Sequence, residues 1–318
     1  MPERRVRLDR PLALEASVRP LYRGAGDPTM RLSRGTLVRA AWMRSGASVL
    51  AVRTASDGSE LEAEAWGPGA EEALERLPAL VGLDDDATGF DPGLHPAVAA
   101  LARRHGGLRL GRTGSVFEAL LPAILEQKVT GAEAFRSFRR LVRALEIPAP
   151  GSFDLWMPAR AADVAGFRSW TFPGLGIEPR RGALLQRVAR DASRLEAIAA
   201  PAARPGAGRE EISVAAAALD TRLRAYTGIG PWTSAEVTFR ALGDPDAVSV
   251  GDAHLPHLVA WVLAGEPRAT DTRMLELLEP WRGHRARVVR LLELSGQAAP
   301  RYGPRVAPRD LVDLAPRR

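Results

Sequence analysis

The sequence predicts an α+β N-terminal domain, with a small antiparallel sheet and helices, followed by a mainly α-helical domain. Three observations support this fold class. Strand-like segments separated by turn residues are confined to the first part of the chain. Helix caps and helical spacing dominate from Pro96 onward, and a turn with two glycines joins two helical segments near residue 229. We place the first domain at residues 1–88, an all-helical domain at 89–296 and a proline- and arginine-rich tail at 297–318.

The first domain contains three segments suited to neighbouring strands. Leu61-Glu62-Ala63-Glu64-Ala65 alternates apolar and polar residues, as a half-buried strand does. Two further segments are apolar and β-branched, and glycine-containing turns separate all three: Thr36–Trp42 and Ser48–Thr54. A helix is predicted over 70–81, and Pro78 should kink it or end it early.

Two capping boxes are predicted in the helical domain. Ser115 with Glu118 precedes an apolar run that ends near Gln127, and Thr130 with Glu133 opens the next helix. Further helices are predicted near 158–167 and 179–198, on both sides of the glycine turn, after Asp252, and over 281–296.

The composition limits the classes of function. The net charge is +6 at pH 7, and Lys128 is the only lysine. This basic balance fits a nucleic-acid partner, although an arginine-rich sequence bias would give the same balance. No cysteine is present, which excludes disulfides, thiolate metal sites and an iron–sulfur cluster. No apolar run approaches the ~20 residues of a membrane span, and the first residues lack a signal-peptide core, so we expect a cytoplasmic protein.

The glycine turn suits phosphate binding. Gly228 and Gly230 allow a tight reversal and a close approach of backbone amides to a ligand. Pro231 stands where a first helical residue belongs, so the amides of Trp232 and Thr233 should point outward from a helix N-terminus, where an anion binds well. The alternative interpretation is an ordinary helix-to-helix turn with a glycine cap.

Asp252 is the candidate catalytic carboxylate, twenty residues after Trp232. A carboxylate can stabilise positive charge that develops in a reaction and can orient water. The alternative role is an N-cap of the following helix, and both roles are compatible. His254 and His257 follow closely, but no third metal ligand accompanies them.

Gly228-Ile229-Gly230-Pro231-Trp232-Thr233, with Asp252 downstream, resembles the signature of the helix-hairpin-helix (HhH-GPD) DNA glycosylase superfamily. The tryptophan after the hairpin resembles the 3-methyladenine-DNA glycosylase II branch. Phe117–Thr130 resembles the segment that this branch places against the DNA minor groove. The resemblance spans about residues 91–295.

The resemblance implies a DNA base-excision repair enzyme, a monofunctional N-glycosylase that removes damaged, alkylated purines flipped out of double-stranded DNA. Asp252 would be catalytic. Relatives with lyase activity place a lysine just after the hairpin, where this chain has Trp232. We therefore expect no lyase activity, no cofactor, a monomer and a nucleoid-associated location.

The resemblance also assigns the remaining site residues. Base-pocket positions fall on Trp232, Glu236 and Ala253, and hairpin carbonyls of Tyr226 and Gly228 would hold a monovalent cation. The DNA-binding positions are Thr227, Gly228, Ile229, Gly230, Thr233, Gln127 and Lys128.

The chain departs from the resembling pattern inside the base pocket. Positions that are often aromatic in relatives fall on Glu236, Ala253 and Arg290, and the residue that fills the gap in the duplex falls near Lys128. These departures leave a second hypothesis open: a catalytically silent DNA- or lesion-binding protein on the same fold.

Overall fold

The computed structural model describes residues 2–300, so residues 301–318 of the predicted tail lie outside the described residues. An antiparallel five-stranded sheet in the order β1-β5-β4-β3-β2 forms the N-terminal part. Its strands are β1 (Glu3–Arg7), β2 (Met30–Ser33), β3 (Thr36–Met43), β4 (Gly46–Thr54) and β5 (Glu60–Trp66). The three predicted strands are confirmed as β3, β4 and β5.

Sequence patterns missed the two edge strands. Only one of the five residues of β1 is apolar. Its register on β5 pairs Arg5 with Glu62 and Arg7 with Glu60, so opposite charges face each other across the two strands. Charged side chains also protect an edge strand from pairing with another chain.

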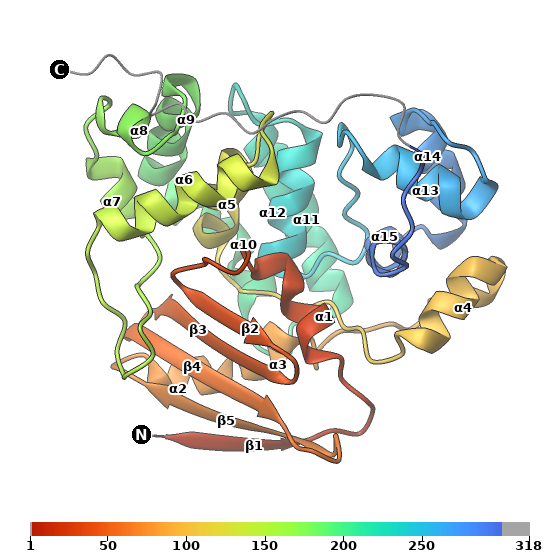
Figure 1. Ribbon diagram of the computed structural model, residues 1–318, viewed down its shortest axis with the longest axis horizontal. Helices are drawn as coiled ribbons and strands as arrows, with labels where there is room; N and C mark the ends of the chain where they lie inside the picture. The colour runs from red at the N-terminus through yellow and green to blue at the C-terminus, as the bar shows by residue number, and fades with distance from the viewer. Residues whose placement is uncertain (1, 301–318) are drawn as a thin grey trace.

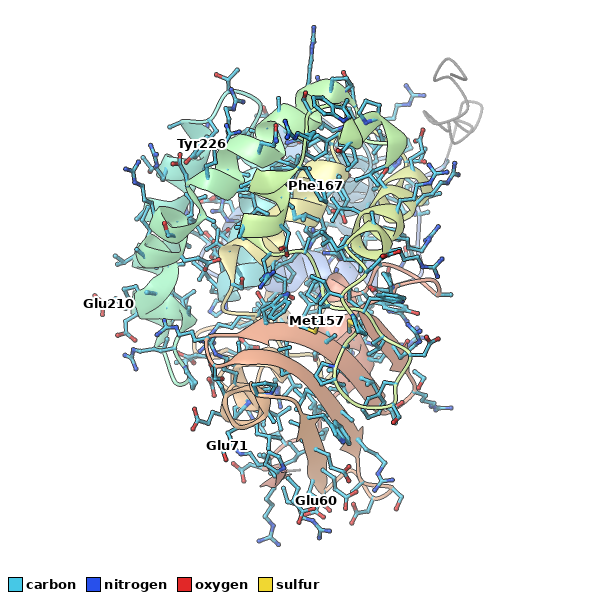
Figure 2. The ribbon with its side chains drawn as sticks, turned by 90° about the vertical axis from the view of Figure 1, so that its left-hand side faces the viewer. Glu60, Glu71, Met157, Phe167, Glu210 and Tyr226 are labelled. Atoms are coloured by element: carbon cyan, nitrogen blue, oxygen red, sulfur yellow. The ribbon has the colours of Figure 1, made fainter. Side chains whose placement is uncertain are left out.

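Helices cover one face of the sheet, and a segment of the helical domain covers the other. The first face packs against α1 (Leu14–Val18), α2 (Ala70–Glu75) and α3 (Leu77–Val81). The predicted helix over 70–81 is interrupted at Arg76, and Pro78 lies in the first turn of α3, as expected. On the other face, Ala40 and Val49 contact Met157, which Figure 2 shows between the sheet and the helices.

The helical part forms two clusters beside the sheet (Figure 1). The larger contains α5 (Val116–Leu125), α6 (Gly131–Ala144), α7 (Ala161–Gly166), α8 (Thr171–Gly174), α9 (Pro179–Arg190), α10 (Ala192–Ala203), α11 (Arg209–Arg224) and α12 (Pro231–Leu242). The smaller contains α4 (Pro96–Arg104), α13 (Leu255–Ala264), α14 (Asp271–Leu278) and α15 (Arg285–Glu293). Short 3-10 helices lie at Arg19–Leu21, Pro92–Leu94 and Glu279–Trp281.

The helix predicted near 179–198 is two helices, because α9 ends at Arg190 and α10 starts at Ala192. The smaller cluster joins segments far apart in the sequence, since Val98 and Leu101 of α4 pack with Val259, Met274 and Val288. None of the described helices is long and apolar enough to cross a membrane.

The two predicted capping boxes have opposite outcomes. The Thr130–Glu133 box is confirmed, with Glu133 N donating to Thr130 Oγ1 and Thr130 N donating to Glu133 Oε2. The Ser115–Glu118 box is wrong. Glu196 of α10 instead accepts hydrogen bonds from the amides of Val116 and Phe117, at 3.0 and 2.9 Å. Glu118 pairs with Arg39 of the sheet.

Candidate active site

The glycine turn is a helix hairpin between α11 and α12. Gly228 has φ +103°, in the region that favours glycine, and the amide of Ile229 donates to the carbonyl of Tyr226 at 2.9 Å. The first helical hydrogen bond of α12 runs from Ser234 N to Gly230 O, so the amides of Trp232 and Thr233 precede it. Figure 2 shows Tyr226, just before the hairpin, at the end of the helical layer away from the sheet.

Two side chains from other parts of the chain hold the hairpin in place. Gln127, which follows α5, donates from Nε2 to the carbonyl of Gly228 and to the hydroxyl of Thr233, both at 2.9 Å. Arg187 of α9 donates to the carbonyl of Thr227 at 2.7 Å. The structure therefore brings the segment around Gln127 against the hairpin, although about a hundred residues separate them.

Lys128 and the hairpin side chains have different surroundings. Lys128 is exposed and has φ +54°, a conformation that is uncommon for a residue other than glycine. Its neighbours are held on both sides, by the Gln127 contacts and by the Thr130 cap. Ile229 and Thr233, in contrast, are buried, and the Ile229 amide already donates to the carbonyl of Tyr226. The side chains of Ile229 and Thr233 are therefore not exposed to a ligand at the hairpin.

The carbonyls of Tyr226 and Gly228, assigned to a monovalent cation by resemblance, each accept one hydrogen bond within the protein. Each carbonyl oxygen has a second lone pair, and carbonyl oxygens suit hard cations. The donor set is therefore compatible with such an ion. Among the described residues, no group of three or more His, Cys, Asp or Glu side chains is arranged to hold a metal ion.

Asp252 is held by three hydrogen bonds. Its Oδ1 accepts from the amides of His254 and Leu255, at 2.7 and 2.9 Å, at the start of α13. Its Oδ2 accepts from the indole Nε1 of Trp232 at 3.0 Å. The N-cap residue of α13 is His254, so Asp252 does not occupy the N-cap position itself. Its hydrogen bonds to the two amides nevertheless orient the carboxylate, which is half-buried.

Asp252 lines a pocket of about 240 Å³ between the two helical clusters. We name it the α12–α15 pocket. Its walls come from α12, the segment leading to α13, α13 itself and α15, with Pro20 at one side. The polar residues of the wall are Glu236, Arg240, Ser249, Asp252, His254, Arg290 and Glu293. A smaller cavity of about 40 Å³ lies between the sheet and α5 and does not include Asp252.

Ion pairs organise the charged wall of the α12–α15 pocket. Glu236 accepts from Ser249 Oγ at 2.5 Å and pairs with Arg240, one helical turn away, at 2.7 Å. Arg240 also reaches Glu126 at the end of α5, at 3.0 Å, and Glu126 lies 3.7 Å from Arg23. Burial lowers the pKa of Arg23 to about 10, with the positive charge of Arg240 adding to the effect and nearby carboxylates opposing it.

Glu293 and Arg290 form a further ion pair on α15. The surrounding protein raises the pKa of Glu293 by desolvation. Arg290 opposes the shift, while the negative charges of Glu236 and Asp252 add to it. The Glu293 side chain is nevertheless 40% exposed, because it faces the open pocket.

The pocket contains some of the predicted residues and omits others. Asp252, Glu236 and Arg290 line it, whereas Trp232 and Ala253 do not belong to its wall. Trp232 contacts the site through Asp252. Sequence reasoning missed Arg240, Ser249 and Glu293. Helical spacing could have found two of them, because Arg240 is four residues after Glu236 and Glu293 is three after Arg290.

Comparisons with known proteins agree with this architecture. No family model matches the chain. A DNA-3-methyladenine glycosylase of Bacillus subtilis (strain 168) is 26% identical over 219 residues, which are 67% of this chain and 68% of the relative. The sequence therefore resembles that of a 3-methyladenine DNA glycosylase, as predicted.

Solved structures share the fold. A 3-methyladenine DNA glycosylase from Archaeoglobus fulgidus has a TM-score of 0.73 and 18% identity, covering 92% of this chain and 97% of that one. An 8-oxoguanine glycosylase/lyase from Clostridium acetobutylicum, solved with double-stranded DNA containing cytosine opposite 8-oxoG, has a TM-score of 0.67 and 14% identity, covering 92% and 95%. The predicted fold class, a small antiparallel sheet followed by a helix-hairpin-helix domain, is confirmed.

Proposed function

We propose that this chain, whose sequence and fold resemble those of the helix-hairpin-helix DNA glycosylases, removes damaged bases from DNA in base-excision repair. One observation carries the proposal. The Asp252 carboxylate is oriented by three hydrogen bonds at the wall of an open pocket, and Trp232 links it directly to the start of α12 behind the hairpin. We infer that the substrate base is a damaged, alkylated purine, as in the relatives named for 3-methyladenine.

Asp252 would act after the damaged nucleotide leaves the base stack and enters the α12–α15 pocket. As the C1′–N bond breaks, the base departs with the bonding electron pair and the sugar gains oxocarbenium-like positive charge. The carboxylate stabilises that charge and orients a water molecule. The water oxygen then adds to C1′, and Asp252 can accept the proton that the water loses.

The hairpin would hold the DNA backbone. The amides of Trp232 and Thr233, at the start of α12, can donate to a phosphate at the positive end of the helix dipole. Gly228 and Gly230 permit the close approach of the phosphate, and exposed Lys128 lies beside the Gln127 contact to the hairpin. Binding through these groups would be independent of sequence and sensitive to salt.

The reaction would stop at an abasic site. A lyase needs an amine that forms a Schiff base with C1′, and the position after the hairpin holds Trp232, whose indole nitrogen donates to Asp252. The proposal includes double-stranded DNA as partner, a monomer, a cytoplasmic, nucleoid-associated location and no iron–sulfur cluster. A borohydride-trapped covalent complex with DNA would contradict the absence of lyase activity.

The decisive experiment measures excision from duplexes that carry hypoxanthine, ethenoadenine or methylated purines, with alkali used to cleave any abasic site. We expect strand cleavage only after alkali, and loss of excision in Asp252→Asn with duplex binding retained. Asn keeps an oxygen that can cap α13, so the variant should fold. Unchanged excision by Asp252→Asn would remove Asp252 from the catalytic role.

The charged lining of the pocket favours a second candidate function, a silent lesion-binding protein. Glu236, Arg240, Arg290 and Glu293 occupy the wall instead of an aromatic cage. Salt-sensitive binding to duplexes that contain a lesion, without cleavage of any of them after alkali, would support this candidate.

A further inference from the structure

The α12–α15 pocket contains a charged pair that faces the space beside Asp252. Arg290 and Glu293 are paired on α15, and both line the pocket. We propose that this pair reads the hydrogen-bonding edge of the extruded base, so that the pocket prefers guanine-type bases to adenine-type bases. The inference rests on the proposed glycosylase function and names the substrate class of the same site.

The pair differs from an ordinary pair on the helix surface. Arg282 and Glu279 are also three residues apart, but their side chains are 69% and 51% exposed. Arg290 is only 16% exposed, and its guanidinium lies 6.0 Å from the ring centroid of Phe239, another residue of the pocket wall. The guanidinium is therefore placed against the pocket, where solvent screening is weaker than at an exposed pair.

Glu293 has an oxygen available to a ligand. Its Oε2 accepts from Arg290, and Oε1 receives no hydrogen bond from the residues that the structure describes. The other carboxylate in the wall is more fully engaged, because both oxygens of Glu236 have partners, Ser249 and Arg240. Glu293 is consequently the acceptor best placed to meet donors on a base.

The edges of the two purine types present different groups to this pair. Guanine offers the O6 acceptor next to two donors, N1–H and the N2 amino group, whereas adenine offers the N6 amino group next to the N1 acceptor. A guanidinium can donate to O6 while the neighbouring carboxylate accepts from N1–H and the N2 amino group. Adenine-type bases can satisfy the carboxylate with one donor only, which leaves a polar group of the pocket less well paired.

A direct test uses DNA methylated at random, which contains 7-methylguanine and 3-methyladenine. Both bases are methylated and cationic, and they present different hydrogen-bonding edges. Comparing each variant with the original chain on the same two bases cancels the other differences between the bases. The rate constants for release of the two bases are measured by chromatography in the same reaction, with enzyme-free DNA as the background. Thermal unfolding shows that each variant is folded.

We expect Glu293→Gln to lower the release of 7-methylguanine about tenfold or more, the effect of losing a hydrogen bond to a charged group. Release of 3-methyladenine should change much less. Glu293→Asp, which keeps a carboxylate, should recover part of the selectivity. The matched control is Glu279→Gln, which alters an exposed pair outside the pocket wall and should change neither rate.

The outcomes separate this inference from the function on which it rests. Release of both bases by the original chain, with the same rate ratio in Glu293→Gln, would overturn the edge-reading role and leave the glycosylase function standing. A fall by the same factor in the release rates of the two bases in Glu293→Gln would also overturn it. Release of neither base by the original chain, together with no excision from the defined duplexes, would instead refute the glycosylase function.

Discussion

The indole Nε1 of Trp232 lies 3.0 Å from Oδ2 of Asp252 and donates a hydrogen bond to it. This contact links the first turn of the helix after the hairpin to the carboxylate that faces the α12–α15 pocket. Trp232, which belongs to the hairpin signature, therefore helps to orient the candidate catalytic carboxylate. In the proposed mechanism, a DNA-binding element and a catalytic group share one hydrogen bond.

Trp232→Phe should lower the excision rate about tenfold, because it removes a hydrogen bond to a charged group while it keeps an aromatic ring. Single-turnover excision with saturating enzyme measures the effect on chemistry apart from DNA binding. Trp261→Phe on α13, outside the pocket wall, is the control. A Trp232→Phe enzyme as fast as the original would show that the two amides at the start of α13 suffice to orient Asp252.

Gln127 should affect duplex binding through the hairpin. Gln127→Ala removes both donors to Gly228 O and Thr233 Oγ1, and Gln127→Glu places a carboxylate against the same two atoms. We expect Glu to weaken binding more than Ala, since alanine only removes the donors, whereas a carboxylate, which accepts only, places negative charge against the Gly228 carbonyl oxygen. Dissociation constants measured at several salt concentrations test this order. Equal binding by all three proteins would exclude a role for Gln127 in holding the hairpin.

The two glycines of the hairpin should respond differently to substitution. Gly228→Ala requires φ +103° for alanine and brings the new Cβ to 3.2 Å from Leu184. We expect it to lower the free energy of unfolding by about 1–3 kcal/mol. Gly230 has φ −102°, and nothing lies within 4 Å of an added Cβ. Gly230→Ala should therefore change stability little.

Urea unfolding and duplex binding together test the role of Gly230. If DNA phosphate approaches this backbone closely, Gly230→Ala will weaken binding without changing the unfolding midpoint. Full DNA affinity in Gly230→Ala would place the phosphate elsewhere on the hairpin.

Glu196 should contribute a pH-dependent term to stability. Burial raises the pKa of Glu196, against the opposing effect of the Val116 and Phe117 amides and Ser115. The folded protein therefore binds this proton more tightly than the unfolded chain does. Glu196 therefore contributes its full stabilisation at a pH below the pKa that it has in the unfolded chain. This stabilisation is lost as the pH rises through the pKa that Glu196 has in the folded protein.

The measurement compares the original chain with Glu196→Gln by urea unfolding across pH. The difference in unfolding free energy, original minus variant, should fall as pH rises from acid conditions. Other titrating groups are common to both proteins and cancel in the difference. A difference that is constant, or that grows with pH, would show that Glu196 is ionised as readily in the folded protein as in the unfolded chain.

Base selectivity should depend on pH through Glu293. Because its pKa is raised, the neutral acid persists to a higher pH than for a glutamate with an ordinary pKa. The ionised form accepts from N1–H, so the preference for guanine-type over adenine-type bases should increase with pH in the original chain and not in Glu293→Gln. The charged and titratable groups that share the pocket wall with Glu293 are Arg290, Glu236, Arg240, Asp252 and His254.

The ratio of the 7-methylguanine and 3-methyladenine rate constants tests this expectation, because loss of activity common to both bases cancels in it. A ratio that does not vary with pH in the original chain would mean that the protonation of Glu293 does not affect which nucleobase is released.

Features that depend on neighbouring residues were predictable from the sequence. The Thr130–Glu133 box needs only residues within one helical turn, and the hairpin turn needs a glycine at Gly228 where φ is positive. The central strands β3, β4 and β5 were predictable because alternation and turns are local patterns. A helix just after Asp252 was predicted from the same kind of local pattern, although His254 is its N-cap.

Tertiary structure alone decided the contacts between distant segments. Ser115 and Glu118 have the spacing of a capping box, yet they do not form one. Packing brings α10 to the N-terminal end of α5, where Glu196 accepts from the first amides, and it brings the sheet close enough for Glu118 to pair with Arg39. The charged wall of the pocket arises in the same way, since α12 and α15 meet only in the folded chain. Spacing along one segment encodes bonds within a helical turn. The partners that a side chain meets across an interface depend on how whole elements pack, which no local pattern specifies.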